Sequence, residues 1–500
     1  MTVLNLINSI NIESLSKLLL YDPRQPLLFN TGLFLVLFAA FLCIYRALRY
    51  HGTLKKVFVI LFSLYFYYKS SAECCFILLG VCVSDYLLGL WLGQVSRPIL
   101  RRGIVALNVI SNVGMLIYFK YTNLLLGSIA GIFNGGHFDA LDIILPAGIS
   151  FFTFRSISYI VDIYRGDMKP ARNFLDYTFF LTFFPPLLAG PVVRAKDMLP
   201  QVEANPHATH EMVSEGLFMI MSGLIKKVVI ADYISGNFVD RIFDNPSLYS
   251  GFENLMGTIG FTLQLYCDFS GYSDMAIGIA LLLGYRFKAN FDAPFKSQNP
   301  TEFWRRWHIS LSSWLRDYIY IPLGGNRKGQ KRQRVNLMAT MLIGGLWHGA
   351  SWMYLLWGAY HGALLVAHKW LSRVWRAPEV LRGTMLLRSV NIAITFVLVV
   401  IGFTFFRASG PENLADMATQ IFSDFRPGIA TQFVEAYMMI VLALCAGYMM
   451  HFTPRGWTDG ATRVYATMPL ALQALLLSAV LFLVIQTRQS DLVPFIYLQY

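Results

Sequence analysis

Charged residues are scarce in this chain of 500 residues: Asp, Glu, Lys and Arg together make up only 14% of it, whereas 56% is hydrophobic. The mean hydropathy of +0.51 lies well above the range of water-soluble domains. The scarcity of charge therefore excludes a soluble globular protein, and most of the chain is expected to lie in lipid. No polar run is long enough to form a separate soluble domain.

Cysteine is also rare: there are six, nearly all inside apolar runs, and none shows the paired spacing of zinc ligands. They are interpreted as small buried residues rather than as disulfides or metal ligands. The signatures of soluble enzymes are missing as well, because the chain has no Gly-x-Ser-x-Gly elbow, no Walker loop and no dinucleotide fingerprint placed after a strand.

The first 25 residues lack a basic region followed by a cleavage site, so a removable signal peptide is not expected. Residues 1–25 are interpreted as an interfacial extension. The net charge of +12 comes from cations in short loops beside apolar segments. This placement is typical of positive-inside topology and contact with lipid headgroups, and it argues against nucleic-acid binding.

Apolar stretches long enough for membrane helices recur along the chain and predict an all-α polytopic membrane protein with roughly eleven to thirteen transmembrane or re-entrant helices. The expected spans cover residues 29–46, 56–68, 72–92, 103–119, 142–161, 175–193, 212–234, 254–267, 271–286, 335–347, 350–370, 387–406, 432–452 and 469–487. Interruptions at Pro146, Pro185–Pro186 and Gly344–Gly345 predict broken helices, which are tolerated only around a protein-lined cavity. Residues 26–500 are expected to form one membrane domain around that cavity.

The strongest basic loop is residues 326–334, NRKGQKRQR, which holds five cations in nine residues and predicts a cytoplasmic location for this loop. The segment before it, residues 303–321, mixes aromatic residues with three arginines. It is expected to form one amphipathic helix at the cytoplasmic interface.

His348 is the first candidate for chemistry. It follows the apolar run that begins at Val335, and thirteen residues of helix rise about 20 Å into the membrane. An ionisable side chain at that depth usually faces a cavity and marks a functional site. The glycines of GGLWHGA, residues 344–350, would leave room for a backbone or a substrate beside the imidazole.

Other ionisable residues allow more than one interpretation. On the expected interfacial helix, His308 is either functional or a side chain reaching the interface, and Arg305 and Arg306 would bind either the phosphates of a donor or anionic lipid. His361 and His368 share a spacing of seven residues but have no nearby acidic or thiolate partners, so no metal site is expected.

Two polar clusters interrupt apolar sequence, at residues 153–162 and 266–274, and each is expected to line the cavity or to bond between helices. Asp268 or Asp274 would either orient a histidine or pair with an arginine or the backbone.

These motifs have a family resemblance. WRRWHISLS at 304–312, YIPLGGNR at 320–327 and GGLWHGA at 344–350 resemble the membrane-bound O-acyltransferase family in order and spacing. The resemblance extends upstream through DFSGYSDMAIG at 268–278, AGPV at 189–192 and ILPAGIS at 144–150, and it covers most of residues 27–410. Within the family the chain is most similar to the branch that O-acetylates alginate, and the branch that transfers D-alanine to teichoic acid is more distant.

The resemblance implies a ring of transmembrane helices around a thin core in a bacterial inner membrane. His348 matches the invariant histidine of the family, and His308 matches a second histidine nearer the cytoplasm. The implied reaction moves an acetyl group from a cytoplasmic thioester, with acetyl-CoA as the donor and no bound cofactor. The acceptor is a polysaccharide hydroxyl, reached directly or through a periplasmic SGNH-like partner protein.

In this chemistry an imidazole with an ordinary pKa near about 6.5 is suited to take the proton of the attacking hydroxyl, so His348 is the expected general base. Glycine-containing turns near Gly345 and Gly349 are expected to stabilise the oxyanion through backbone N–H groups. His308 would position the donor or relay a proton. The residues expected around the substrates form one set: Trp304, Arg305, Arg306, Trp347, Asp268 and Asn326.

Two features depart from the family pattern: the extension over residues 1–25, and Arg155, which stands where relatives commonly carry Gln or Glu. A cation beside the cavity would change the choice of acceptor. Two alternative functions remain: transfer of D-alanine or another acyl group from an acyl carrier protein, and a non-catalytic export or transport subunit, which broken helices also allow.

Overall fold

The computed structural model describes residues 17–133, 138–374, 383–487 and 495 of the chain. This described part consists of helices, turns and loops without a β-strand, which confirms the predicted all-α fold class. Most of the expected extension over residues 1–25 lies outside the described residues. Where the described chain begins, Lys69 Nζ donates a hydrogen bond of 3.0 Å to Leu18 O.

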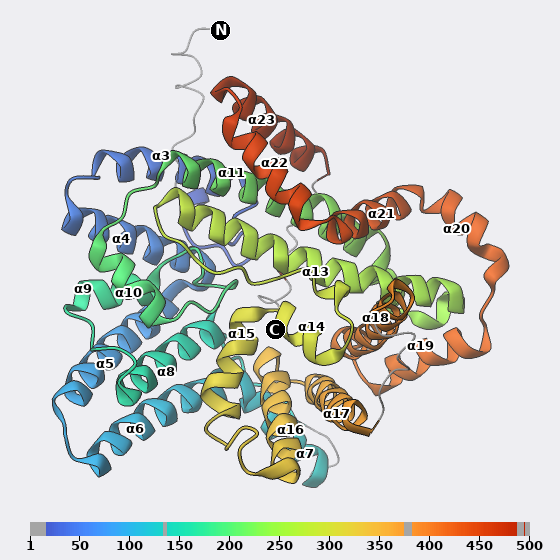
Figure 1. Cartoon of the computed structure of the whole chain (residues 1–500), viewed down its shortest axis with the longest axis horizontal. Helices are drawn as coiled ribbons and strands as arrows, with labels where there is room; N and C mark the ends of the chain where they lie inside the picture. Colours follow the sequence, from blue (N-terminus) through green and yellow to red (C-terminus); the bar gives the residue numbers. More distant parts are fainter. Residues whose placement is uncertain (1–16, 134–137, 375–382, 488–494, 496–500) are drawn as a thin grey trace. The chain divides into compact units, whose positions relative to one another are not determined.

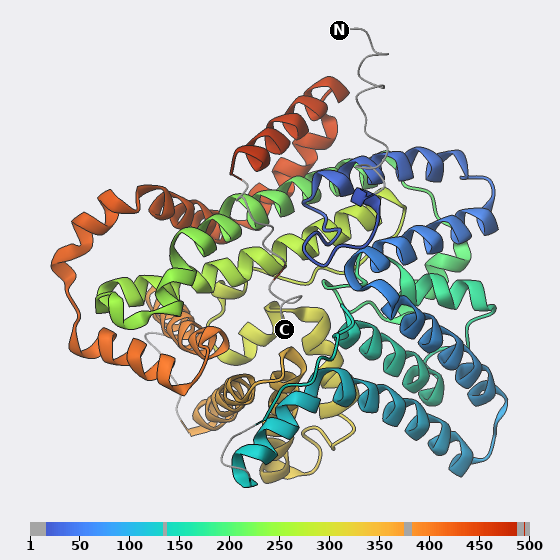
Figure 2. The same cartoon turned by 180° about the vertical axis from the view of Figure 1, so that it is seen from behind.

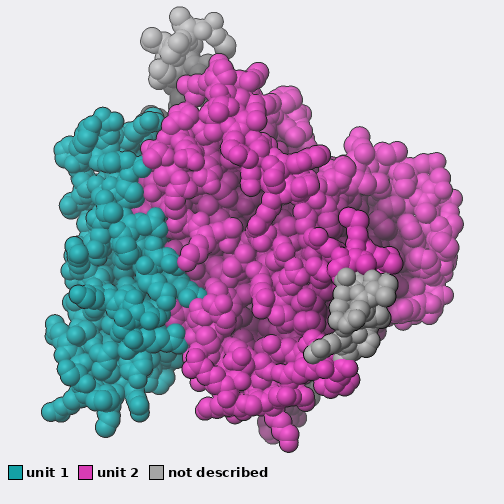
Figure 3. Space-filling view, in the orientation of Figure 1, with its two compact units in different colours: residues 1–122, 139–188, 194–207 teal, residues 123–138, 189–193, 208–500 magenta. Residues whose placement is uncertain are grey.

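The chain packs as two compact units, each assembled from separate segments (Figure 3). Unit 1 comprises residues 1–122, 139–188 and 194–207, and unit 2 comprises residues 123–138, 189–193 and 208–500. The expectation of one membrane domain over residues 26–500 stays a prediction.

Unit 1 is built around α8, a helix whose side chains are nearly all buried and which packs against α5, α6 and α9. Its helices are α3 (Gly32–Ala47), α4 (Gly52–Ser71), η1 (Ala72–Cys74), α5 (Cys75–Gln94), α6 (Pro98–Leu116), η2 (Ile117–Tyr121), α8 (Ile149–Arg165), α9 (Phe174–Thr182) and α10 (Ala195–Ala204).

Polar side chains bond these helices together, as predicted for the cluster at 153–162. Asp85 accepts hydrogen bonds from Asn108 Nδ2 at 2.8 Å and from Tyr177 Oη at 2.7 Å. Arg155 is fully buried; its guanidinium donates to Phe180 O and lies 4.7 Å from the centre of the Phe180 ring. The cation is therefore held in the interior of unit 1.

Unit 2 contains the longer part of the chain. Its longer helices carry labels in Figure 1 and are seen from behind in Figure 2. Its helices are α7 (Thr122–Phe133), α11 (His210–Leu224), η3 (Ile225–Asp232), η4 (Ser235–Val239), α12 (Asp240–Asp244), η5 (Pro246–Leu248), α13 (Gly251–Leu282), η6 (Pro294–Lys296), α14 (Pro300–Arg306), α15 (Ile309–Leu315), η7 (Arg316–Tyr320), α16 (Gly329–His348), α17 (Trp352–Val374), α18 (Met385–Arg407), α19 (Pro411–Ser423), η9 (Pro427–Ile429), α20 (Ala430–Ala436), α21 (Met438–Phe452), α22 (Arg455–Thr467) and α23 (Leu470–Thr487).

Helix α13 is one unbroken helix of 32 residues beside α11, so the prediction of two spans at 254–267 and 271–286 is wrong. The polar residues between those two stretches do not break the helix because each acid has a cation opposite it on η3. Asp268 Oδ1 lies 2.5 Å from Lys227 Nζ, and Asp274 Oδ2 lies 2.6 Å from Lys226 Nζ. These ion pairs offset the cost of placing carboxylates inside a helical bundle.

Helix α16 also continues through the glycine pair that was expected to interrupt it. The glycines serve close packing instead: a Cβ at Gly345 would lie 2.3 Å from Tyr354 O, and a Cβ at Gly358 would lie 2.5 Å from Met341 O. Small residues of this kind let two membrane helices approach backbone to backbone. The packing of α16 on α17 therefore requires glycine.

The single interfacial helix expected over residues 303–321 is instead three short elements, α14, α15 and the π-helix η7. The break falls at His308, whose φ of +42° and ψ of +57° lie in the left-handed region. A helix cannot continue through this conformation, and the turn directs His308 into the interior, where it is 0% exposed.

Four helices in the described ranges are long and apolar enough to cross a membrane: Gly52–Gln94, Pro98–Phe133, Met385–Arg407 and Leu470–Thr487. A fifth is added when Pro427–Ala436 and Met438–Phe452, bent by 96°, count as one span. The remaining expected spans coincide with helices that are shorter or carry more charge. Their polar side chains bond inside the protein, as α13 illustrates.

Candidate active site

His348 is the last residue of α16 and is 4% exposed. Its ring lies in an aromatic pocket, with centroid distances of 4.9 Å to Trp357 and 5.2 Å to Phe406. Gly349 follows directly, and a Cβ there would lie 2.1 Å from the ring of Tyr354. The glycine thus allows the chain to turn from α16 toward α17 immediately after the histidine.

His308 is held by a small network centred on Asn290. His308 Nδ1 lies 3.2 Å from Asn290 Oδ1, and Ser310 donates to the same oxygen from its backbone N at 3.2 Å and from its Oγ at 2.8 Å. A backbone N–H can only donate, so Asn290 Oδ1 is an acceptor and His308 Nδ1 carries the proton. The lone pair of neutral His308 is therefore on Nε2. Asn290 is in turn fixed by Ser273 Oγ at 3.0 Å from its Nδ2.

The two histidines belong to one aromatic cluster of unit 2. The ring of His308 lies 6.0 Å from that of Trp347, and the ring of Trp347 lies 5.1 Å from that of His348. The structure thus brings together His308 and His348, which are forty residues apart in the chain, with the predicted site residue Trp347 touching both.

A cavity of about 360 Å³ adjoins this cluster and is the most basic hollow among those described in unit 2. Trp304, Arg305, Arg316 and Lys369 line it, together with side chains from α15 and α16. Arg305 is exposed and forms no ion pair with a described residue. Arg305 thus adds positive charge to the cavity, and its binding of an anionic donor stays a prediction.

Arg306 lies outside the cavity. Its Nη2 lies 2.9 Å from Glu302 Oε1 and its Nη1 lies 3.6 Å from Asp292 Oδ2, and it does not line the cavity. Both arginines were expected beside the donor; Arg305 lines the cavity, whereas Arg306 faces Glu302 and Asp292. The role of Arg306 is an ion pair that holds α14 to the loop before it.

Two further expected residues lie away from the cavity. Asp268 pairs with Lys227, which also contacts Asp232 at 2.8 Å, so Asp268 belongs to a buried ion cluster. Asn326 is exposed in the turn before α16. A role for Asp268 or Asn326 in substrate binding stays a prediction.

Sequence reasoning missed three residues of the site. Asn290 precedes His308 by eighteen positions and lies in a loop, so no local pattern marks it. Trp357 and His361 are on α17, and their rings lie 4.8 Å apart. The signal that was available is their spacing of four residues, which places them on one face of a helix that follows His348. His361 was considered only as a metal ligand, and the described residues contain no cluster of three metal-binding side chains.

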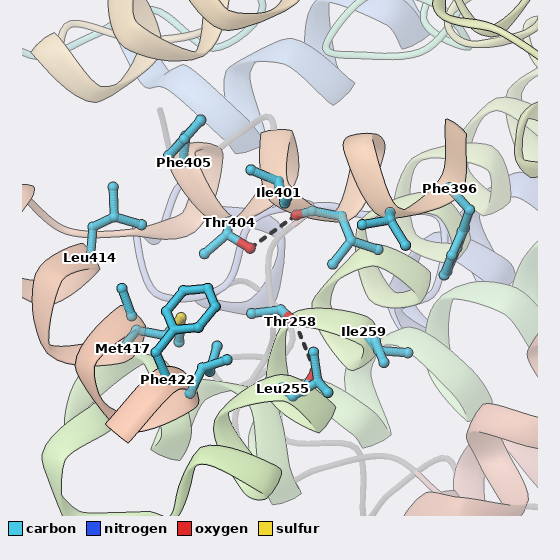
Figure 4. Close-up of a pocket in the computed structure, with 14 residues that line it drawn as sticks. Leu255, Thr258, Ile259, Phe396, Ile401, Thr404, Phe405, Leu414, Met417 and Phe422 are labelled. Atoms are coloured by element: carbon cyan, nitrogen blue, oxygen red, sulfur yellow. Dashed lines mark hydrogen bonds between the residues drawn. The ribbon is translucent and has the colours of Figure 1, made fainter. Parts of the chain in front are cut away.

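A second cavity, of about 490 Å³, lies between α13, α18 and α19 (Figure 4). Phe396, Ile401, Met417 and Phe422 are among its apolar lining residues, and Thr404 Oγ1 is satisfied by Val400 O at 2.9 Å. None of its lining residues is ionisable. This cavity is suited to apolar matter and not to acid–base chemistry.

Comparison with known proteins gives consistent results. A model described as the MBOAT, membrane-bound O-acyltransferase family, matches residues 170–409. A probable alginate O-acetylase AlgI from Pseudomonas aeruginosa is 43% identical over 395 residues, which cover 78% of this chain and 73% of that protein. A peptidoglycan O-acetyltransferase from Helicobacter pylori is 37% identical over 422 residues, covering 77% and 78%. A teichoic acid D-alanyltransferase from Bacillus subtilis is 28% identical over 282 residues, covering 54% and 70%.

Fold and site together define a multi-pass membrane protein with two buried histidines in one aromatic cluster. The chain belongs to the membrane-bound O-acyltransferase family and is an O-acyltransferase. The resemblance found in the sequence motifs is thereby confirmed.

Proposed function

We propose that this protein moves an acetyl group from cytoplasmic acetyl-CoA to a hydroxyl of a cell-envelope or secreted polysaccharide in the inner membrane of a bacterium. Transfer is direct or passes through a periplasmic SGNH-like partner protein. The relatives named for alginate and peptidoglycan O-acetylation support the acetyl group and the polysaccharide acceptor.

The observation that carries the proposal is the contact between the basic cavity and the histidine cluster. Trp304 lines the cavity and its ring lies 5.6 Å from that of Trp357, which in turn packs 4.9 Å from His348. A donor whose phosphates meet Arg305, Arg316 and Lys369 thus has its thioester end directed toward His348.

In this proposal His348 takes the proton of the acceptor hydroxyl, because a neutral hydroxyl is a poor nucleophile until a base assists it. The burial of His348 among aromatic rings excludes water, which limits loss of the thioester by hydrolysis. His308, with its proton fixed on Nδ1, offers Nε2 as an acceptor near the same cluster and positions the donor or relays a proton.

The test is acyl transfer from radiolabelled acetyl-CoA in membrane vesicles, with intact protein and His348→Ala at matched expression. We expect label on polymer or partner with intact protein and a decrease of about 10²- to 10⁴-fold in the variant, the range for loss of a general base. Equal labelling in both samples would remove His348 from the mechanism.

A second function is supported by the D-alanyltransferase relative: transfer of another acyl group from an acyl carrier protein whose pantetheine arm enters the basic cavity. Carrier-bound thioester, supplied in place of acetyl-CoA, would then be the active donor.

A further inference from the structure

Three buried ring nitrogens meet in one cluster beside His348. Trp304 is 9% exposed, and Trp357 and His361 are each 1% exposed. Ring centroids lie 5.6 Å apart for Trp304 and Trp357, 5.2 Å for Trp304 and His361, and 4.8 Å for Trp357 and His361. Nε1 of each tryptophan and Nε2 of His361 are buried and form no hydrogen bond with a described residue.

Such a cluster is unusual for a protein interior. Buried N–H groups nearly always have a hydrogen-bond partner, because removing one from water without replacing the bond is unfavourable. Phenylalanine would pack at these positions without that cost, and unit 2 uses phenylalanine freely around them, as at Phe303 and Phe403. Three nitrogens together therefore point to a polar ligand that supplies the missing acceptors.

The position of the cluster identifies that ligand. Trp304 lines the basic cavity, and Trp357 packs against His348. The ring contacts therefore lead from the cavity at Trp304 through Trp357 to His348. In a thioester donor the polar groups of this region are the amide carbonyls of the pantetheine arm and the carbonyl of the acyl group, and all of them accept hydrogen bonds.

We propose that Trp304, Trp357 and His361 form the binding site for the acyl end of the donor: Trp304 donates to an amide carbonyl of the arm, and Trp357 with His361 donates to the thioester carbonyl oxygen. This inference rests on the proposed function. The expectation that glycine backbone N–H groups near Gly345 and Gly349 stabilise the oxyanion stays a separate prediction.

The electron movements follow from this arrangement. The acceptor oxygen forms a bond to the acyl carbon while its proton passes to His348, and the carbonyl electrons move onto the oxygen that faces the ring donors. When this oxyanion collapses, the carbon–sulfur bond breaks, the thiolate leaves, and it takes the proton from His348. Donors already in place for the oxyanion stabilise it more strongly than the carbonyl, which is how they increase the rate.

The Nε2 edge of His361 also faces α18. A Cβ at Gly402 would lie 2.6 Å from His361 Nε2, so glycine at this position leaves room for the imidazole. Gly402 thus helps to fix the position of the His361 ring, and Gly402→Ala is expected to displace that ring without changing its chemistry.

The test replaces the ring N–H group of a single tryptophan with sulfur. Benzothienylalanine has the shape of tryptophan with sulfur in place of N–H, and it is introduced at position 357, at position 304 and, as a control, at Trp91, which is 48% exposed on α5. The full chain in lipid nanodiscs is then titrated with coenzyme A and with an acetyl-CoA analogue in which a methylene replaces the sulfur. That analogue keeps the carbonyl and cannot transfer its acyl group.

We expect replacement at 357 to weaken binding of the ketone analogue about five- to tenfold, the effect of one neutral hydrogen bond, with unchanged binding of coenzyme A. Acetyl transfer should lose about 10²-fold in kcat with a much smaller change in KM. Replacement at 304 should weaken both probes equally, and replacement at 91 neither. His361→Gln, which keeps a nitrogen near the position of Nε2, should retain more activity than His361→Phe.

Two results would overturn the inference, and only one of them would also overturn the proposed function. If the unmodified protein discriminates between the probes and the protein replaced at 357 does so equally, the ring donors have no part in carbonyl binding while the proposed function stands. If the unmodified protein binds neither probe, the coenzyme A thioester itself is the wrong donor, and the proposed function fails together with this site.

Discussion

His308 Nδ1 lies 3.2 Å from Asn290 Oδ1, and the backbone of His308 is left-handed at the same point. The contact with Asn290 fixes the tautomer of the imidazole. The left-handed backbone fixes the direction in which the side chain leaves the main chain. Strained backbone that is held by surrounding contacts is characteristic of functional positions. Asn290 is therefore a positioning residue for His308.

Replacing Asn290 tests this relationship. Asn290→Ala removes the acceptor that holds the proton on Nδ1, so we expect kcat for acetyl transfer to decrease at least about tenfold with little change in KM. Ser273→Ala is the matched control, because it removes the partner of Asn290 Nδ2 and leaves the contact of Asn290 Oδ1 with His308 in place. An equal loss of kcat in both variants would contradict a role through the tautomer.

Because the backbone of His308 is left-handed, two substitutions of this residue are expected to differ in the stability of the protein while both lose activity. Glycine adopts φ of +42° without the cost of about 1–2 kcal/mol that alanine bears there. His308→Gly is therefore expected to be more stable than His308→Ala by about 1 kcal/mol in thermal unfolding in detergent, although both lack the imidazole and both lose transfer activity. Equal unfolding temperatures for the two variants would show that the backbone relaxes on substitution.

The α16–α17 contact predicts a strong effect of one methyl group. In Gly358→Ala the new Cβ would lie 2.5 Å from Met341 O, so the helices must separate. We expect a loss of about 1–3 kcal/mol in stability, the usual cost of overpacking, and a loss of transfer activity because His348 ends α16. Gly114→Ala on α6 is the control: nothing lies within 4 Å of its Cβ, and alanine is the better helix former. Activity that survives in Gly358→Ala would contradict this account of the packing.

Adjacent arginines provide a matched pair for donor binding. Arg305→Ala removes a cation from the basic cavity and should raise the KM for acetyl-CoA about five- to tenfold, with a smaller effect at high salt. Arg306→Ala breaks the contacts with Glu302 and Asp292 and should lower the unfolding temperature without changing KM. Initial rates over a range of donor concentration distinguish the two, and a raised KM in Arg306→Ala alone would place the donor on the other face of α14.

The sequence predicted those candidate site residues that a local sequence feature marks. His348 at the end of an apolar run and the motif around Trp304 are visible without a fold, because depth in a helix follows from residue count. The partners of these residues are not local. Asn290 and His361 reach the cluster only through a left-handed turn and a glycine-packed helix pair, and neither arrangement can be read from a period of apolar residues.

Contacts between residues that are distant in sequence also explain the errors in the predicted fold. An apolar-window argument ends one span before Asp268, whereas Lys227 of η3 pairs with Asp268 and allows α13 to continue. It treats Gly344–Gly345 as a break, whereas closely packed backbones favour glycine inside a helix. In both cases contacts with a neighbouring element determine whether the helix continues. A single sequence does not show which element that is.

The beginning of α16 is unusually rich in positive charge. Its first turns include Lys331 and Arg332, all five cations of residues 326–334 are exposed, and no acidic residue lies in the first turn. Positive side chains at this end oppose the helix dipole, which favours anions there. An anionic leaflet reverses that balance, since each cation near such a surface gains about 1 kcal/mol. We therefore predict that anionic headgroups stabilise the helix that carries His348, so that the lipid composition of the membrane affects how firmly this histidine is held.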